Sequence, residues 1–132
     1  MKKDIAIIGL GKMGRNLALN LIEKKWRVFG FNRTAVVTKK LEKEGLRGTY
    51  SFQELVSNLP SPRVIWLMLP AGAPTEEAIF GRNGIAKLLE RGDILIDGGN
   101  AFYKDSARRA KKLSKKGIEF IDVGVSGGPG GA

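Results

Sequence analysis

The first stretch that could do chemistry is GLGKMG, at residues 9–14, directly after the apolar run DIAII. Its glycines have the spacing G-x-G-x-x-G. In that pattern Gly9 permits a tight turn, Gly11 lets the backbone approach a pyrophosphate, and Gly14 allows close contact between a helix and a strand. The free N–H groups and the dipole of a helix that begins here would hold phosphate charge. The motif alone is weak evidence, but after a first strand it predicts a dinucleotide-phosphate site.

A second polar group, Asn32-Arg33-Thr34, follows the apolar run WRVFGF at 26–31. Sites that bind NAD usually carry an acidic residue here, which bonds the ribose 2′-hydroxyl. A carboxylate would repel a 2′-phosphate, whereas an amide, a guanidinium and a hydroxyl supply donors to it. The group therefore predicts NADP rather than NAD. Asn32 or Thr34 also suits the N-cap of the next helix, and both roles can hold together.

Three further turns end apolar runs: MLPAG at 68–72, DGGN at 97–100 and VSGG at 125–128. All three are small and open, so a flat ring or a sugar can approach their backbone. Taken as structure alone they are ordinary strand-ending turns, and they indicate function only together with the first two motifs.

The segments that must position these turns alternate between two patterns. Short apolar runs predict buried strands, and apolar residues three or four apart predict helices. The expected strands are 4–9, 26–31, 47–50, 62–70, 93–99 and 118–125, and the expected helices are 12–25, 35–45, 51–59, 74–80, 85–90 and 101–117. This alternation predicts an α/β fold, a doubly wound, mostly parallel sheet of the Rossmann type with helices on both faces. Residues 1–123 then form one nucleotide-binding domain, and 124–132 a glycine-rich loop.

Composition excludes several kinds of chemistry. The chain has no cysteine and no histidine, so thiolate chemistry, disulfides, the commonest metal ligand and the commonest general base are all absent, and we expect no metal. Its 23 lysines and arginines against 13 acids give a net charge of +10. These basic residues are scattered along the expected helices rather than gathered in a stripe with aromatics, so we expect no nucleic-acid partner. No apolar run reaches membrane-spanning length, and we expect a cytoplasmic protein without a membrane partner.

Together and in this order, GLGKMG, FNRT, MLPAG, DGGN and VSGG resemble the amino-terminal coenzyme domain of the 6-phosphogluconate dehydrogenase family, the decarboxylating enzymes of the pentose phosphate pathway. LPAG at 69–72 resembles the short-chain form of that family. The resemblance spans nearly the whole chain. Single motifs are shared with 3-hydroxyisobutyrate dehydrogenases, but Asn-Arg-Thr combined with DGGN is more specific.

The resemblance implies NADP as cofactor and a phosphorylated sugar acid, 6-phosphogluconate, as substrate, oxidised at C3 with loss of carbon dioxide. The cofactor-binding residues it implies are Gly9, Leu10, Gly11, Lys12, Met13, Gly14, Asn32, Arg33, Thr34, Leu69, Pro70, Ala71 and Asn100. The substrate-binding residues it implies are Asn100, Ser126, Gly127 and Gly128. The pair Pro129-Gly130, which follows them, departs from the family pattern, so the resemblance does not fix how the substrate is positioned there.

In the family, a lysine general base and an asparagine lie on a helix beyond the glycine-rich loop, and a later all-helical domain closes the pocket and forms a homo-oligomer. We therefore expect no catalytic residue in this chain, a general base beyond Ala132, and no turnover by the isolated chain. Two alternatives stay open, namely another 3-hydroxyacid dehydrogenase and a non-catalytic nucleotide-binding module. The residues beyond Ala132 would separate a 6-phosphogluconate dehydrogenase from another 3-hydroxyacid dehydrogenase.

Overall fold

Six parallel strands form a single sheet in the computed structural model, which describes residues 3–124. The strand order is β3-β2-β1-β4-β5-β6, and every pairing among these strands is parallel. The strands are β1 (Asp4–Ile8), β2 (Arg27–Phe31), β3 (Arg47–Gly48), β4 (Val64–Leu67), β5 (Ile94–Asp97) and β6 (Glu119–Asp122). Along the chain, β1, β2 and β3 extend the sheet in one direction, and β4, β5 and β6 then extend it in the other. The sheet is therefore doubly wound, as the sequence predicts.

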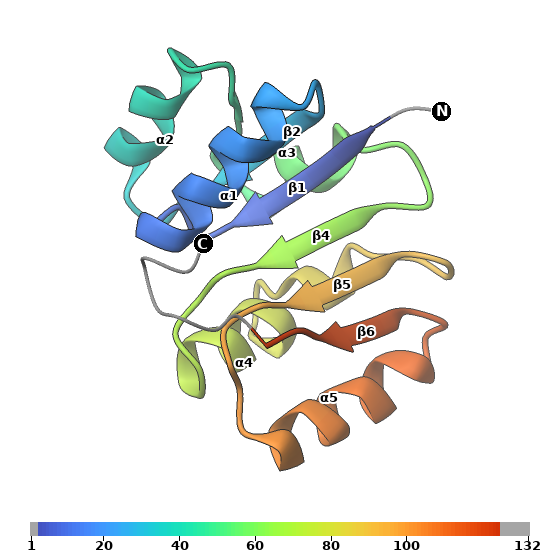
Figure 1. The fold of residues 1–132 in the computed structure, drawn as a ribbon. Coiled ribbons are helices and arrows are strands. Elements are labelled where there is room, and N and C mark those ends of the chain that lie inside the picture. The colour runs from blue at the N-terminus through green and yellow to red at the C-terminus, as the bar shows by residue number, and fades with distance from the viewer. Residues whose placement is uncertain (1–2, 125–132) are drawn as a thin grey trace.

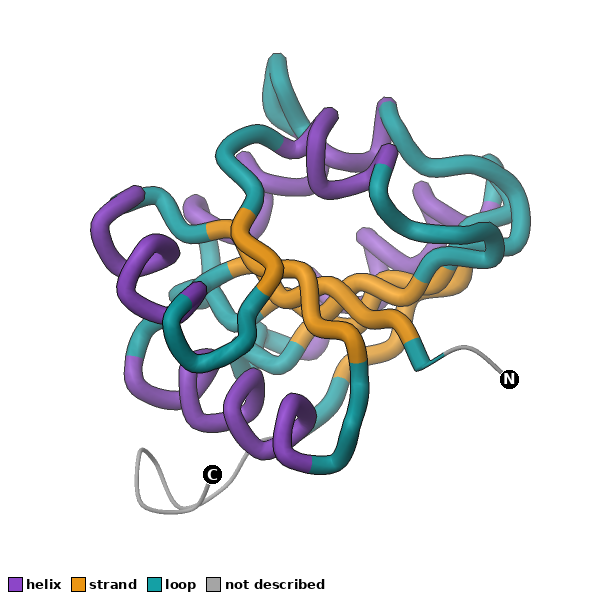
Figure 2. Tube along the Cα trace, turned by 90° about the horizontal axis from the view of Figure 1, so that it is seen from above, coloured by secondary structure: helices purple, strands orange, loops and turns teal. Residues whose placement is uncertain are grey.

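Helices cover both faces of this sheet (Figures 1 and 2). Ile5 and Ile7 of β1 pack in one core cluster with residues of α1 (Lys12–Glu23) and α2 (Ala35–Glu42). Ala6 and Ile8 point the other way, because side chains alternate along a strand. They pack in a second cluster with residues of α3 (Phe52–Ser57), α4 (Ala73–Phe80), the 3₁₀ segment η1 (Ile85–Lys87) and α5 (Tyr103–Ser114). The sheet thus lies between two apolar layers.

Strand register brings the strand-ending turns to one edge. Ile8, the last residue of β1, lies opposite Phe31 of β2 and Leu67 of β4, which also end their strands. Leu67 in turn lies opposite Asp97, and Asp97 opposite Asp122. The loops that follow β1, β2, β4 and β5 therefore leave the sheet at the same level. That level is the carboxyl edge, where open α/β sheets bind ligands.

The observed elements are shorter than the expected segments mainly at their ends. The expected helix 85–90 is only the 3₁₀ turn Ile85–Lys87, because Gly84 and Gly92 flank a segment too short for a regular helix. In the expected strand 62–70, only Val64–Leu67 forms a strand: all four residues pair with β5, and the last three also pair with β1. The glycine-rich loop expected at 124–132, with Ser126, Gly127 and Gly128, lies outside the described residues except for Gly124. Among residues 3–124, no helix is long and apolar enough to cross a bilayer.

Candidate dinucleotide-binding site

Two glycines of the GLGKMG loop are required by the packing of the protein itself. Gly9 has a positive φ of 99°, and a Cβ there would lie 2.3 Å from the carbonyl oxygen of Met68. A Cβ on Gly14 would lie 1.9 Å from the carbonyl oxygen of Gly9. Both glycines therefore let β1, α1 and the end of β4 approach one another closely. These are the turn and contact roles that the motif predicts for them.

Gly11 is different, because a Cβ there would meet no atom of the protein within 4 Å. Gly11 is also the N-cap of α1, has no side chain to cap the helix, and is followed by a first turn without acidic residues. The N–H groups of that first turn are therefore left for a ligand, and the helix dipole favours an anion beside them. The N-terminus of this twelve-residue helix is therefore uncapped and unobstructed, which suits the binding of a pyrophosphate.

Asn32 connects the end of β2 to this loop. Its Oδ1 accepts a hydrogen bond from the N–H of Leu10 at 2.8 Å, and its Nδ2 donates to the carbonyl of Thr34 at 3.2 Å. The Asn32 side chain thus holds the glycine loop in place, which the sequence pattern did not indicate. Thr34 is the N-cap residue of α2, but its side chain makes no capping hydrogen bond.

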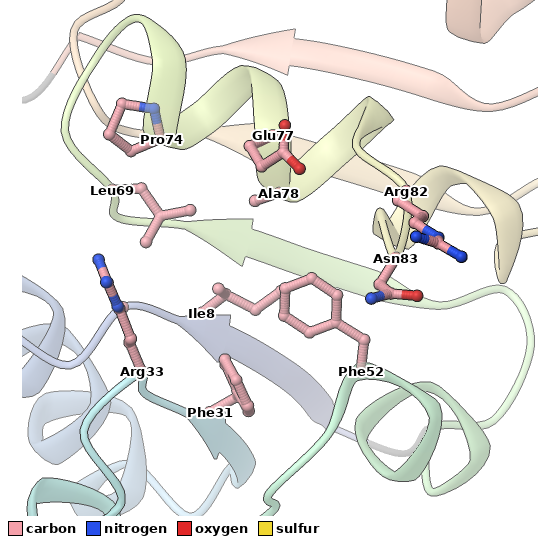
Figure 3. A pocket seen from close by; sticks show the side chains of 11 residues that line it. Ile8, Phe31, Arg33, Phe52, Leu69, Pro74, Glu77, Ala78, Arg82 and Asn83 are labelled. Carbon is pink, nitrogen blue, oxygen red and sulfur yellow. The ribbon is translucent and has the colours of Figure 1, made fainter.

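Arg33 lies at the mouth of a cavity of about 700 Å³ beside the switch point between β1 and β4 (Figure 3). Its side chain is exposed, and no acidic side chain among the described residues forms an ion pair with it. The guanidinium extends from the end of β2 toward Leu69 and Pro74 on the opposite wall (Figure 3). A free cation in this position can bind an anion that enters the cavity.

The walls of this first cavity are mostly apolar. Phe31 and Phe52 meet edge to face, with their ring centroids 5.0 Å apart, and Ile8 and Leu69 line the cavity with them. Arg82 and Asn83 add polar groups at the end away from Arg33, and Glu77 adds one between that end and Pro74 (Figure 3). An apolar slot with a few polar groups suits a flat heteroaromatic base. Sequence reasoning missed the residues supplied by α3, α4 and the turn after α4, namely Phe52, Pro74, Glu77, Ala78, Arg82 and Asn83.

A second cavity, of about 350 Å³, lies where the glycine loop faces the ends of β4 and β5. The backbone here is tightly packed, since a Cβ on Gly99 would lie 2.3 Å from the carbonyl oxygen of Leu69. Asn100 follows in the left-handed region, with φ 57°. The cavity is lined by Gly11, Lys12, Met13, Gly14, Met68, Leu69, Pro70, Gly98, Gly99 and Asn100.

The predicted cofactor residues are therefore divided between these features. The two cavities bring together Gly9, Gly11, Lys12, Met13, Gly14, Arg33, Leu69, Pro70 and Asn100. Leu10, Asn32, Thr34 and Ala71 lie outside the lining of both. Leu10 and Asn32 contribute through their mutual hydrogen bond. Within residues 3–124, no cluster of three His, Cys, Asp or Glu side chains is placed to hold a metal ion.

Comparison with known protein families identifies the family of dinucleotide-binding domains to which this fold belongs. Residues 4–132 match the model of the NAD binding domain of 6-phosphogluconate dehydrogenase. The chain belongs to this family. A decarboxylating 6-phosphogluconate dehydrogenase of Buchnera aphidicola is 47% identical over 100% of the chain, which covers 28% of that relative. The chain thus corresponds to the coenzyme domain and spans little more than a quarter of the length of the curated 6-phosphogluconate dehydrogenases that it matches.

Solved structures agree with this family. The 6-phosphogluconate dehydrogenase of Plasmodium falciparum, described in apo form and in complex with its cofactor NADP+ and its substrate, is 40% identical with a TM-score of 0.84, over 97% of this chain and 28% of that one. A 3-hydroxyisobutyrate dehydrogenase of Mycobacterium tuberculosis is 25% identical with a TM-score of 0.83, over 100% of this chain and 43% of that one. The fold is common to both enzyme types, and sequence identity favours 6-phosphogluconate dehydrogenase.

Proposed function

We propose that this chain binds NADP along the carboxyl edge of its sheet, as the cofactor domain of a decarboxylating 6-phosphogluconate dehydrogenase. The observation that carries the proposal is the unpaired Arg33 guanidinium at the mouth of an apolar cavity at the end of β2. In a site for NAD an acidic side chain would occupy the end of this strand. Here the charge is positive, and it suits a 2′-phosphate.

The rest of the dinucleotide follows from the position of the pyrophosphate. With the pyrophosphate at Gly11 and the first turn of α1, the adenosine half extends toward Arg33 and the first cavity, since β2 lies on that side. The nicotinamide half then extends the other way, into the second cavity between the glycine loop and the ends of β4 and β5. Gly9, Leu10, Gly11, Lys12, Met13, Gly14, Asn32, Arg33, Thr34, Leu69, Pro70, Ala71 and Asn100 form this proposed site, with Leu10 and Asn32 shaping the loop.

The proposed reaction is oxidation of 6-phosphogluconate at C3 followed by loss of carbon dioxide. NADP, when bound, accepts the hydride. The chain's own residues hold and orient the dinucleotide, and Asn100 stands at the second cavity, where the sugar acid would meet the nicotinamide. Ser126, Gly127 and Gly128 would bind the acid from the segment outside the described residues. The general base beyond Ala132, the homo-oligomer and the cytoplasmic location remain predictions.

The test is a calorimetric titration of the 132-residue chain with NADP and with NAD. We expect NADP to bind more tightly, because only NADP carries the phosphate that Arg33 can reach. Equal affinities for the two dinucleotides would contradict the proposed 2′-phosphate site. Binding of neither would contradict the proposed function of the isolated chain.

A further inference from the structure

Arg109 of α5 is a charged side chain placed almost entirely inside the protein, with 1% of it exposed. Its guanidinium reaches three separate segments. Nε donates to Oε1 of Glu76 on α4 at 2.8 Å, and Nη2 donates to the carbonyl of Gly72 at 3.4 Å. Nη1 lies 3.8 Å from Oδ2 of Asp97, the last residue of β5. One side chain therefore contacts the loop after β4, the helix that follows that loop, and the end of β5.

The two loops that Arg109 contacts form a wall of the second cavity. Gly72 closes the MLPAG loop, and Leu69 and Pro70 of that loop line the cavity. Asp97 holds the DGGN turn, because its Oδ1 accepts a hydrogen bond from the N–H of Gly99 at 2.9 Å. Arg109 lines neither cavity, so it acts on these loops from behind.

Stability alone is a poor explanation for this arrangement. Burying a guanidinium is costly, and apolar residues of similar volume often stabilise a protein as well or better. The contact with Asp97 is also incomplete, since Arg109 Nη1 and Asp97 Oδ2 have no hydrogen-bond partner among the described residues. What the arginine supplies is its planar fork, whose several donors fix the relative positions of groups on different segments.

We propose that Arg109 is a positioning residue for the nicotinamide half of the dinucleotide, because it sets the separation between the 68–72 loop and the 97–100 turn. This inference rests on the proposed binding of NADP. The 2′-phosphate contact of the adenosine half does not depend on Arg109, because Arg33 follows β2, whereas the contacts of Arg109 are with Gly72, Glu76 and Asp97.

The experiment compares two ligands on the 132-residue chain. NADPH reaches both cavities, whereas 2′,5′-ADP carries only the adenosine half with its 2′-phosphate. The test variant is Arg109→Lys, which keeps the positive charge but lacks the planar guanidinium with its several donors. We expect its affinity for NADPH to fall about tenfold, the scale of one lost hydrogen bond to a charged group. Its affinity for 2′,5′-ADP should stay within about twofold of the unmutated chain.

The neighbouring Arg108 provides a matched control. It also pairs with Glu76, but 47% of its side chain is exposed and no contact joins it to Gly72 or Asp97 among the described residues. Arg108→Lys should leave both affinities unchanged. If Arg109→Lys does not fold, Asp97→Asn gives a second route, because it removes the charge that faces Arg109 and keeps an oxygen for Gly99. The same selective loss of NADPH affinity is expected.

A loss of both ligands in equal measure, or of neither, would overturn the positioning role. So would an unmutated chain that binds NADPH no more tightly than 2′,5′-ADP, because the nicotinamide half would then make no contact to position. That result would leave the adenosine site intact. An unmutated chain that binds neither ligand would instead refute the proposed NADP site itself.

Discussion

Removal of the Arg33 guanidinium should weaken NADP binding and leave NAD binding nearly unchanged. In the structure this side chain is exposed and has no acidic partner among the described residues, so Arg33→Ala leaves no buried group unpaired. The loss should therefore equal the contact with the 2′-phosphate. A hydrogen bond to a charged group contributes about 1.5–3 kcal/mol. At about 1.4 kcal/mol per factor of ten, NADP affinity should fall roughly 10- to 150-fold.

Isothermal titration calorimetry of both proteins with both dinucleotides measures this effect. Arg91→Ala is a matched control, since it removes one exposed arginine from the turn before β5, at the opposite edge of the sheet. The control should keep the affinity for NADP. An Arg33→Ala chain that retains NADP affinity, or that loses NAD affinity to the same extent, would refute the assignment of Arg33 to the 2′-phosphate.

Four other substitutions test separate parts of the structure. Asn32→Asp keeps an oxygen for the N–H of Leu10 but places a carboxylate near the 2′-phosphate, so the ratio of NADP to NAD affinity in titration should fall. Gly11→Ala should keep the thermal midpoint and abolish dinucleotide binding, whereas Gly14→Ala should lower the midpoint, because only its Cβ collides with the protein. The pKa of Glu76 is lowered to about 2, chiefly by its hydrogen bonds with Arg108. Burial alone would raise this pKa, and the contact with Arg109 lowers it further. Glu76 therefore adds stability that is complete above its usual pKa of 4.5 and is lost as pH falls toward 2. The difference in unfolding free energy between the chain and Glu76→Gln, measured by urea titration, should shrink over that range, and a constant difference would contradict the pairing.

Local pattern was sufficient to predict the fold because the strands other than the two-residue β3 lie in short apolar runs that end at a turn. Ile5 to Ile8 are buried on both faces, as a continuous apolar run predicts for a central parallel strand. The roles of Gly9 and Gly14 were also predictable, since their spacing carries the geometry of a strand-to-helix turn. The helix expected at 85–90 is only a 3₁₀ turn over Ile85–Lys87, because its apolar spacing also fits a buried turn.

The rest of the site depends on contacts between residues distant in the chain. The hydrogen bond from Leu10 to Asn32 crosses 22 positions, and Arg109 reaches Glu76 across 33. In the sequence, Phe52 and Pro74 have the pattern of ordinary core or helix-start residues, and only the sheet order places them around the first cavity. Arg109 lies within the basic run RRAKKLSKK at 108–116, a pattern that is typical of a solvated helix face. One member of that run is buried, and spacing alone did not single it out.

A crystal structure of the chain with NADP tests the central claim most directly, because it locates each part of the dinucleotide at once. We predict a pyrophosphate against Gly11 and the first turn of α1, a 2′-phosphate on Arg33, and a nicotinamide between the glycine loop and the 97–100 turn. A 2′-phosphate away from Arg33, or a dinucleotide bound elsewhere than the carboxyl edge of β1, β2 and β4, would contradict the account.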